Sequence, residues 1–362
     1  MPRLPVVLLL LLSTVGAEEV GAEWPHSVQP FYLSATYADL SADEARYLSQ
    51  LPVVVINHKQ GGTGSSEEEK QLHALSQVKA VNPACKTFFY LNSQIDFPGL
   101  QLHTQFAANG SWWLRDDAGD FVLHGNDHIF DLTVEAARNT WLSVAKHALS
   151  QPFISGVFVD KAGDFFDDAW SSSHLEMLES LGATAAAVKK QLIFNNVGIA
   201  GMAGQLFERW AENPDHDGLN FLQDIALLEN ATDFSNAGQL NLLRAGGVRS
   251  GTIHVEPPEV CGAGLAAMLV AVASPNAAFF ACMPSFNIVD GWRDLDKNEI
   301  YKLHLGAPKG KAVVGKDGII TRDFEGAHVA LDPKTNVNRT LTRGCVQWAS
   351  GETTGVCPHT RK

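Results

Sequence analysis

Residues 153–160 read Phe-Ile-Ser-Gly-Val-Phe-Val-Asp, a short apolar run that ends abruptly in a carboxylate. Such a run is typical of a strand that is buried on both faces of a parallel sheet. Short apolar, β-branched or aromatic runs of this kind recur along the chain, and segments with helical character separate them. The eight strands predicted in this way are residues 31–33, 53–56, 87–91, 154–159, 192–194, 225–228, 251–255 and 277–281.

The segments between these runs carry apolar residues near the helical period of 3.6. The predicted helices are residues 42–51, 67–81, 134–149, 172–191 and a shorter one at 240–245. Strands that alternate with helices indicate an α/β protein with a parallel sheet, and eight such strands predict a (β/α)8 TIM barrel.

An open, doubly wound sheet is the structural alternative. Two signals that would favour it are missing, because no Gly-x-Gly-x-x-Gly follows the first strand and no Lys-Ser/Thr completes a phosphate loop after Gly61-Gly62-Thr63-Gly64. We interpret this glycine cluster as a flexible loop between a strand and a helix.

Composition and net charge restrict the classes of binding partner that the protein can have. The 362 residues include 45% hydrophobic and 19% charged ones, which is enough apolar surface for a large core, and the formal net charge is −13. Nucleic acid and anionic membranes are therefore poor partner candidates. Arg3, an apolar run at 6–12 and small residues at 15–17 predict a signal peptide cut after Ala17, and hence a secreted or lumenal protein without a membrane span.

Three parts of the chain are expected: the signal peptide at 1–17, the barrel at 18–305 and a small β-rich appendage at 306–362. The appendage follows a last helix expected around residues 298–305, and its short β-like runs alternate with turn residues.

Five cysteines in an exported chain predict disulfides. Cys345 and Cys357 flank a polar tail with little core of its own, so we expect them to be bridged, and Cys261 with Cys282 is a weaker second pair. Cys85 is then left over. Sequons for N-glycosylation occur at Asn109, Asn230 and Asn338.

Polar residues follow the predicted strands at their carboxyl ends, which meet at one mouth of a (β/α)8 barrel. Aromatic residues near these loops offer flat apolar faces of the kind that suits sugar rings. The candidate binding residues are Tyr37, Asn57, His58, Tyr90, Asn92, Trp113, Asp131, Asp164, Asn195, His254 and Glu256.

Two of these strand ends carry a candidate catalytic carboxylate. Asp160 ends the strand at 154–159, and Glu229 ends the predicted strand at 225–228. By itself Asp160 could cap the next helix or pair with Lys161. Two carboxylates that face each other across a mouth can instead divide into a nucleophile and a general acid for glycosidic bonds.

For a retaining reaction we expect the two carboxyl groups about 5–5.5 Å apart. Asp160 should accept hydrogen bonds from donors such as Lys161 or an Asn at a strand end, and Glu229 should lie in a drier pocket that raises its pKa. If Glu229 faces the mouth, Asn230 points outward into the helix layer and should not be glycosylated.

Several segments resemble (β/α)8 glycoside hydrolases of the group called hypothetical glycosyl hydrolases, and more distantly the endo-α-1,4-polygalactosaminidase family. They are Asp131-Leu-Thr133, Gly156-Val-Phe-Val-Asp160, Ile225-Ala-Leu-Leu-Glu229, Leu305-Gly-Ala-Pro-Lys-Gly310 and Arg322-Asp-Phe-Glu-Gly326. The resemblance covers roughly residues 30–335. It implies a secreted glycoside hydrolase with Asp160 as nucleophile and Glu229 as acid/base. Two residues depart from the pattern of these families. Lys161 follows the strand-end Asp where a small or amide residue is common, and Ala327 stands where a glycine is common.

Two other functions remain open. A catalytically inactive barrel that binds glycans, as a lectin or matrix protein does, would keep the aromatic residues without using the carboxylate pair. A metal-dependent hydrolase could be built on His58, His254 and Glu256. The leading hypothesis requires neither metal nor cofactor, and its partner is a carbohydrate.

Overall fold

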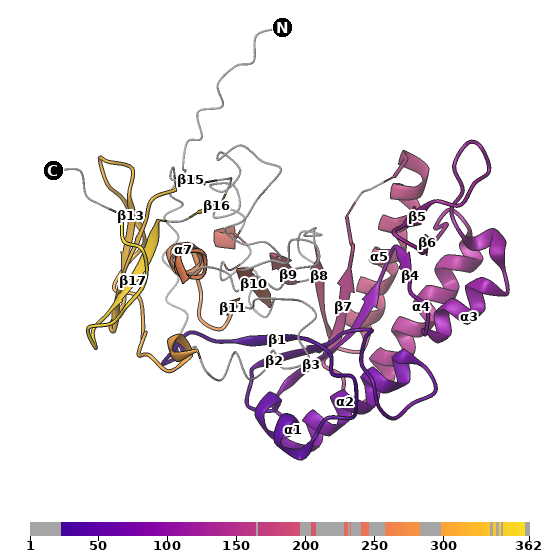
Figure 1. Ribbon diagram of the computed structural model, residues 1–362, viewed down its shortest axis with the longest axis horizontal. Helices are drawn as coiled ribbons and strands as arrows, with labels where there is room; N and C mark the ends of the chain where they lie inside the picture. Colours follow the sequence, from indigo (N-terminus) through magenta and orange to yellow (C-terminus); the bar gives the residue numbers. More distant parts are fainter. Residues whose placement is uncertain are drawn as a thin grey trace, which may run out of the picture.

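The computed structural model describes residues 23–163, 166–195, 204–207, 228–230, 232, 240–245, 258–282, 298–333, 336–337, 340–341 and 343–358. Its centre is a sheet of eight parallel strands that pair in chain order (Figure 1). These strands are β1 Phe31–Ser34, β2 Val53–Ile56, β3 Lys86–Asn92, β7 Gly156–Asp160, β8 Gln191–Asn195, β9 Gly204–Phe207, β10 Asn241–Ala245 and β11 Ala278–Cys282.

The last strand returns to the first. The amide of Phe280 in β11 donates a hydrogen bond of 2.9 Å to the carbonyl of Gln29, just before β1. This contact brings the two ends of the sheet together, and the predicted (β/α)8 TIM barrel is confirmed.

Helices cover the outside of the barrel (Figure 1). The helices that follow the barrel strands are α1 Ala42–Leu48, α2 Glu67–Val81, α4 Glu135–Ser150, α5 Asp168–Ala187 and α7 Pro258–Ala271. Local sequence sets their starts, because Ser41 and Glu44 form a reciprocal capping box at α1 and the Asp167 side chain accepts from the amide of Trp170 at α5.

Two of the eight strands differ from the sequence prediction. The sixth is β9, and the seventh is β10, which covers residues 241–245 where a short helix was predicted. Residue 228, predicted to end the sixth strand, is helical instead, and residues 251–255 lie outside the described part. The apolar run of β10 is too short for periodicity to separate strand from helix, and only pairing with β9 and β11 settles it.

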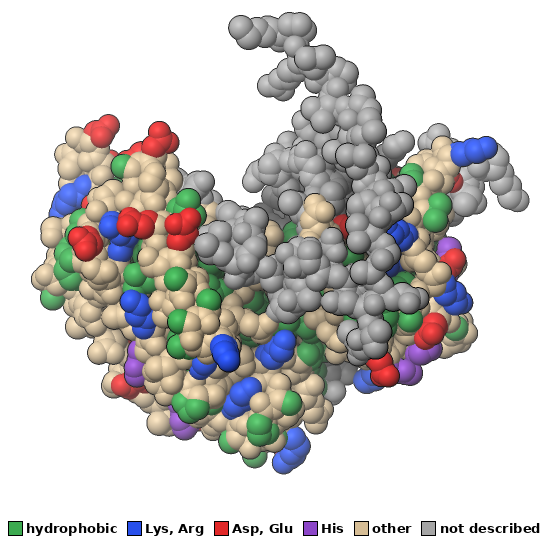
Figure 2. Space-filling view, turned by 180° about the vertical axis from the view of Figure 1, so that it is seen from behind, with side chains coloured by type: hydrophobic (Ala, Val, Ile, Leu, Met, Phe, Trp, Pro, Cys, Tyr) green, Lys and Arg blue, Asp and Glu red, His purple; other side chains and the backbone are tan. Residues whose placement is uncertain are grey.

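A small insertion follows β3 and carries its own three-stranded antiparallel sheet. Its elements are β4 Ile95–Asp96, α3 Gln101–Ala107, the 3-10 turn η1 Gly110–Trp112, β5 Leu123–His124 and β6 Asp127–Ile129. Asp116, Asp117 and Asp120 are exposed in its longest loop, and Figure 2 shows acidic side chains gathered at this end of the molecule. The sequence did not predict this unit.

The C-terminal part is a separate antiparallel sheet that packs on α7 (Figure 1). Buried Val329 and Val346 from the sheet meet Ala266 and Leu269 from the helix. The expected last helix is only the 3-10 turn η3 Glu299–Tyr301. The sheet strands are β12 Val313–Val314, β13 Ile320–Asp323, β14 Ala327–Leu331, β17 Gly344–Trp348 and β18 Thr353–Gly355, with β15 Asn336–Val337 and β16 Thr340–Leu341 as a separate pair.

Both predicted disulfides are present. Cys345 and Cys357 have Cα atoms 4.8 Å apart, and those of Cys261 and Cys282 are 5.6 Å apart. Cys85 is free and buried, and burial raises the pKa of its thiol to about 11. In the described part of the chain, no helix is long and apolar enough to cross a bilayer.

Candidate functional site

The carboxylate of Asp160 lies at the carboxyl end of β7 and accepts hydrogen bonds at both oxygens. The hydroxyl of Tyr90 and the amide of Asn92 donate to Oδ2, the latter at 3.0 Å. The side-chain amide of Asn195 and the backbone N–H of Lys161 donate to Oδ1 at 2.7 and 2.8 Å. Three neighbouring strands therefore fix one carboxylate, because Asn92 and Asp160 are register partners and Asn195 ends the adjacent strand β8.

The backbone after Asp160 is held in an unusual conformation. Lys161 has a φ of 59°, in the left-handed region that non-glycine residues rarely adopt. Its carbonyl accepts hydrogen bonds from Ser93 Oγ at 2.9 Å and from the Gln94 side chain at 2.7 Å. Strained backbone that its surroundings hold in place clusters at functional sites, so this turn supports a functional role for Asp160.

A buried histidine supports the same turn from outside the barrel. His174 of α5 is 1% exposed, and its Nε2 lies 2.9 Å from Ser93 Oγ. Burial lowers the pKa of His174 to about 4. The neutral ring thus holds Ser93, whose hydroxyl also lies 3.0 Å from the carbonyl of Asp160.

A stack of rings extends the site toward β2. The imidazole of His58 lies flat on Phe97 with ring centroids 3.9 Å apart and 5.3 Å from that of Tyr90. Burial, together with the charge of Lys59, lowers the pKa of His58 to about 4, so the ring is neutral at physiological pH. Its Nδ1 is buried and has no hydrogen-bond partner among the described residues.

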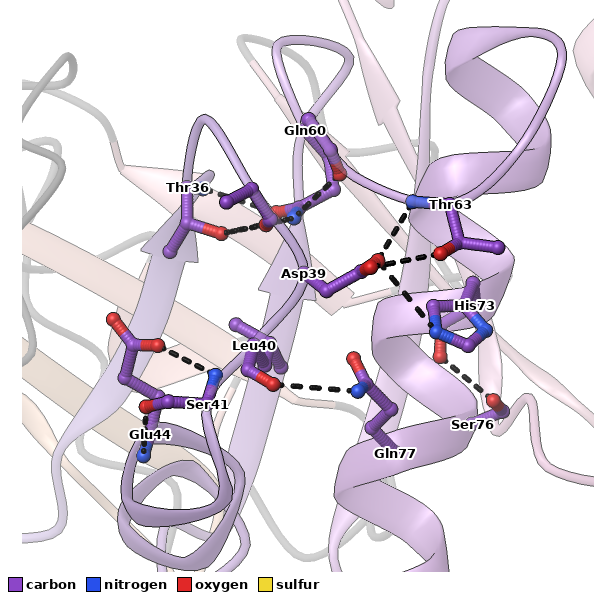
Figure 3. Close-up of polar contacts among 12 residues, drawn as sticks. Thr36, Asp39, Leu40, Ser41, Glu44, Gln60, Thr63, His73, Ser76 and Gln77 are labelled. Atoms are coloured by element: carbon purple, nitrogen blue, oxygen red, sulfur yellow. Dashed lines mark hydrogen bonds and ion pairs between the residues drawn. The ribbon is translucent and has the colours of Figure 1, made fainter.

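The loops that follow β1 and β2 are locked to each other (Figure 3). The buried side chain of Gln60 accepts from the amide of Thr36 at 3.0 Å and donates to the Thr36 hydroxyl and to the Ala38 carbonyl. Asp39 accepts from the backbone and the hydroxyl of Thr63, both at 2.7 Å, which lowers the pKa of its carboxyl. The glycine cluster forms the predicted loop between a strand and a helix, and these contacts tie it to the loop after β1.

One glycine of the cluster is required by close packing. A Cβ on Gly61 would overlap the backbone carbonyl of Tyr37, so the two loops can approach only because position 61 has no side chain. The Tyr37 side chain is nevertheless 70% exposed. A rigid backbone therefore presents an exposed aromatic ring in the loop after β1.

The structure does not bring Glu229 to Asp160. Glu229 is exposed within a helical segment, residues 228–230, and not at the end of a strand. The Thr232 hydroxyl, three residues on, accepts from the amide of Ala273, which lies between α7 and the amino end of β11. Asp160 lies at the opposite, carboxyl end of the barrel strands, so these two residues do not form the predicted pair.

The neighbour of Glu229 is a cation of the C-terminal sheet. Burial lowers the pKa of Arg322 to about 10, and the charge of Glu229 opposes that shift. Exposure of Glu229 also contradicts the expected dry pocket. Asn230 is exposed too, which removes the reason for expecting its sequon to be unused.

The side chains of three other candidate binding residues make local contacts within their own loop, turn or insertion. Trp113 donates to buried Asp96 at 2.7 Å, and His128 covers one ring face at 4.0 Å. Asp131 accepts from the backbone and hydroxyl of Thr133 in the turn before α4. The side chain of buried Asn57 accepts from the amide of Lys59 at 2.9 Å and shapes the loop after β2.

Asp164, His254 and Glu256 lie outside the described residues. The metal alternative rested on two of them. Among the residues that the structure does describe, no group of three or more His, Cys, Asp or Glu side chains is arranged to hold a metal ion.

Ser93, Gln94, Phe97 and His174 were missed by the sequence prediction. The polar run Asn92-Ser93-Gln94 begins at the last residue of β3 and was a usable signal. His174 gave none, because a histidine within a helix reaches the site only through the packing of α5 on the barrel.

No protein-family model matches the chain, and no curated protein sequence does. Among solved structures it is similar to a maltogenic alpha-amylase, AmyB, from Thermotoga neapolitana, with 9% identity, 84% of this chain and 86% of that chain covered, and a TM-score of 0.48. An alpha-amylase from Anoxybacillus shows 8% identity over 91% and 93% of the chains, with a TM-score of 0.48. The GH36 alpha-galactosidase AgaA from Geobacillus stearothermophilus shows 10% identity over 84% and 47%, with a TM-score of 0.43. These structures are glycoside hydrolases, but the likeness is too distant to assign a reaction to this chain.

Proposed function

We propose that this protein is a retaining glycoside hydrolase with Asp160 as its nucleophile. The observation that supports the proposal is a carboxylate at the mouth of a (β/α)8 barrel, fixed by four donors from three neighbouring strands and followed by a strained residue. Four donors match the roughly four lone-pair sites of a carboxylate, so the attacking oxygen exchanges one of these hydrogen bonds for its bond to the substrate.

In the proposed reaction, one carboxylate oxygen of Asp160 attacks the anomeric carbon and forms a glycosyl ester. The bond to the leaving oxygen breaks as an acid protonates that oxygen. Water then attacks the same carbon, gives a proton to the conjugate base of that acid and releases Asp160. The donors around Asp160 hold the attacking oxygen in place during both steps.

The acid/base is proposed to follow the sixth strand. The sequence predicts the acid/base at the end of the sixth strand. In the structure the sixth strand is β9, which ends at Phe207. The next residue in the sequence is Glu208, which lies outside the described residues. We therefore move the proposed acid/base from Glu229 to Glu208, on strand order alone.

Neutral groups around Asp160 favour a sugar with free hydroxyls. His58, Asn92 and Asn195 supply neutral ring and amide groups, and Phe97 supplies an apolar ring. The two disulfides fit the proposed export through residues 1–17. Asn109 is exposed and available for a glycan.

The test is hydrolysis of a polysaccharide and oligosaccharide panel by the mature protein and by Asp160→Asn, Glu208→Gln and Glu229→Gln. We expect Asp160→Asn and Glu208→Gln each to lose at least about 10³-fold in turnover, and Glu229→Gln to keep wild-type turnover. NMR of the first product should show the substrate's anomeric configuration.

Full turnover by Asp160→Asn contradicts the assigned nucleophile. Glycan binding without hydrolysis, in the wild type and in all three variants, supports the inactive glycan-binding barrel instead. Loss of turnover in Glu229→Gln alone identifies Glu229 as the acid/base and contradicts the assignment of Glu208 from strand order.

A further inference from the structure

Two histidines that are 278 residues apart in the sequence lie against each other outside the mouth. His26 precedes β1, and His304 follows the turn η3. Their Nδ1 atoms are 3.0 Å apart, their ring centroids 4.4 Å, and their planes are inclined by 37°. Both side chains are exposed.

The backbone fixes both positions. The carbonyl of His26 accepts from the amide of Leu305 at 2.7 Å, which ties the segment before β1 to the residue after His304. On the other side, a Cβ on Gly326 would overlap both the carbonyl and the ring of His304. Because the chain on either side is held, the two rings need little ordering to act together.

The ring arrangement is not that of a straight hydrogen bond. Two imidazoles joined in plane through a nitrogen contact of this length would have centroids more than about 5 Å apart, because each nitrogen lies about 1.1 Å from its ring centre. The shorter centroid distance means that the Nδ1 lone-pair axes are bent away from the line between the nitrogens.

The spacing of the nitrogens suits a metal ion. Two imidazole nitrogens bound at about 2.0–2.1 Å lie about 2.9 Å apart at a right angle and about 3.3 Å apart at a tetrahedral angle. The distance in this protein is 3.0 Å, close to the right-angle value. Right-angle imidazole ligation is typical of Cu(II) and Ni(II).

We propose that His26 and His304 chelate a divalent transition-metal ion of the Cu(II) or Ni(II) class through their Nδ1 atoms. Water completes the coordination, because the described residues hold no group of three or more metal-ligating side chains. The Glu325 carboxylate and the His304 ring both flank Gly306. The carboxylate therefore adds negative charge beside the ion. The bound ion clamps the segment that enters β1 to the segment that leads into the C-terminal sheet.

This site is independent of the proposed hydrolase chemistry, since His26 precedes the amino end of β1 and Asp160 lies at the carboxyl end of β7. The probes are NiCl2 and CuCl2, titrated by calorimetry into the untagged mature protein, with MgCl2 as the control ion. The variants are His26→Ala and His304→Ala. His328→Ala is the matched control, because the His328 side chain is 44% exposed and lies 2.7 Å from Asp323 in the C-terminal sheet.

We expect wild type and His328→Ala to bind one more equivalent of Ni(II) than His26→Ala and His304→Ala, or to bind it at least 10-fold more tightly. NiCl2 should raise the Tm of the first two proteins only, since an ion that binds the folded state stabilises it. The Cu(II) spectrum of the wild type should show two coordinated nitrogens. Equal stoichiometry, affinity and Tm shift in all four proteins would overturn the proposal.

Discussion

Acid should weaken this fold through the buried histidine that supports the candidate site. His174 is 1% exposed, and burial lowers its pKa to about 4, whereas an unfolded histidine titrates near about 6.5. Between these values the unfolded chain binds a proton that the folded protein does not. Stability is therefore lost as the pH falls from about 6.5 to about 4, and no contribution from this group remains to be lost outside that window.

The magnitude follows from the difference between the two pKa values. At about 1.4 kcal/mol for each pH unit, His174 alone costs about 3 kcal/mol over the whole window. That is a large part of the free energy of unfolding of a typical folded domain, which is about 5–15 kcal/mol. The loss also bears on the site, because the ring contacts Ser93, whose hydroxyl lies beside the carbonyl of Asp160.

The assay is urea unfolding of the wild type and of His174→Gln at pH 7, 6, 5 and 4, followed by tryptophan fluorescence. Glutamine keeps an amide near Ser93 but cannot titrate. As the pH is lowered, the free energy of unfolding of His174→Gln should therefore fall less steeply than that of the wild type, by about 1.4 kcal/mol for each pH unit. His147→Gln, an exposed histidine on α4, is the control and should follow the wild type. Equal slopes for wild type and His174→Gln would refute the reasoning.

Three further predictions concern stability and the loops at the mouth. Cys357→Ser, which opens the bridge to Cys345, should lower the free energy of unfolding by about 3 kcal/mol in urea, and a reducing agent should remove that difference from the wild type. Glu68→Ala should cost about 2–3 kcal/mol in the same assay, because this buried carboxylate accepts two backbone N–H groups at the start of α3; an unchanged midpoint would contradict that role. Gly61→Ala should displace the loop that carries Tyr37 and lower the Tm, and a crystal structure with both loops unmoved would contradict the packing argument.

The sequence predicted the fold class and most of the barrel. Buried parallel strands are continuous apolar runs, so β1, β2, β3, β7, β8 and β11 were recognisable without any tertiary information. The disulfide between Cys345 and Cys357 followed from their short spacing in a polar tail. The position of Asp160 at a strand end was recognisable for the same reason, since a charge at the end of a buried run marks the point where the strand leaves the core.

The sixth and seventh strands, and with them Glu229, were decided by tertiary structure. An apolar run of about four or five residues fits a buried strand or one face of a helix equally well, and pairing with neighbouring strands selects between them. That selection made residues 241–245 a strand, whereas Glu229 lies in a helical segment and its charge acts on Arg322. The support of Asp160 by Ser93 and His174 was equally invisible, because it joins the end of β3 to a helix 81 residues away, and only the folded barrel brings such positions within hydrogen-bonding distance.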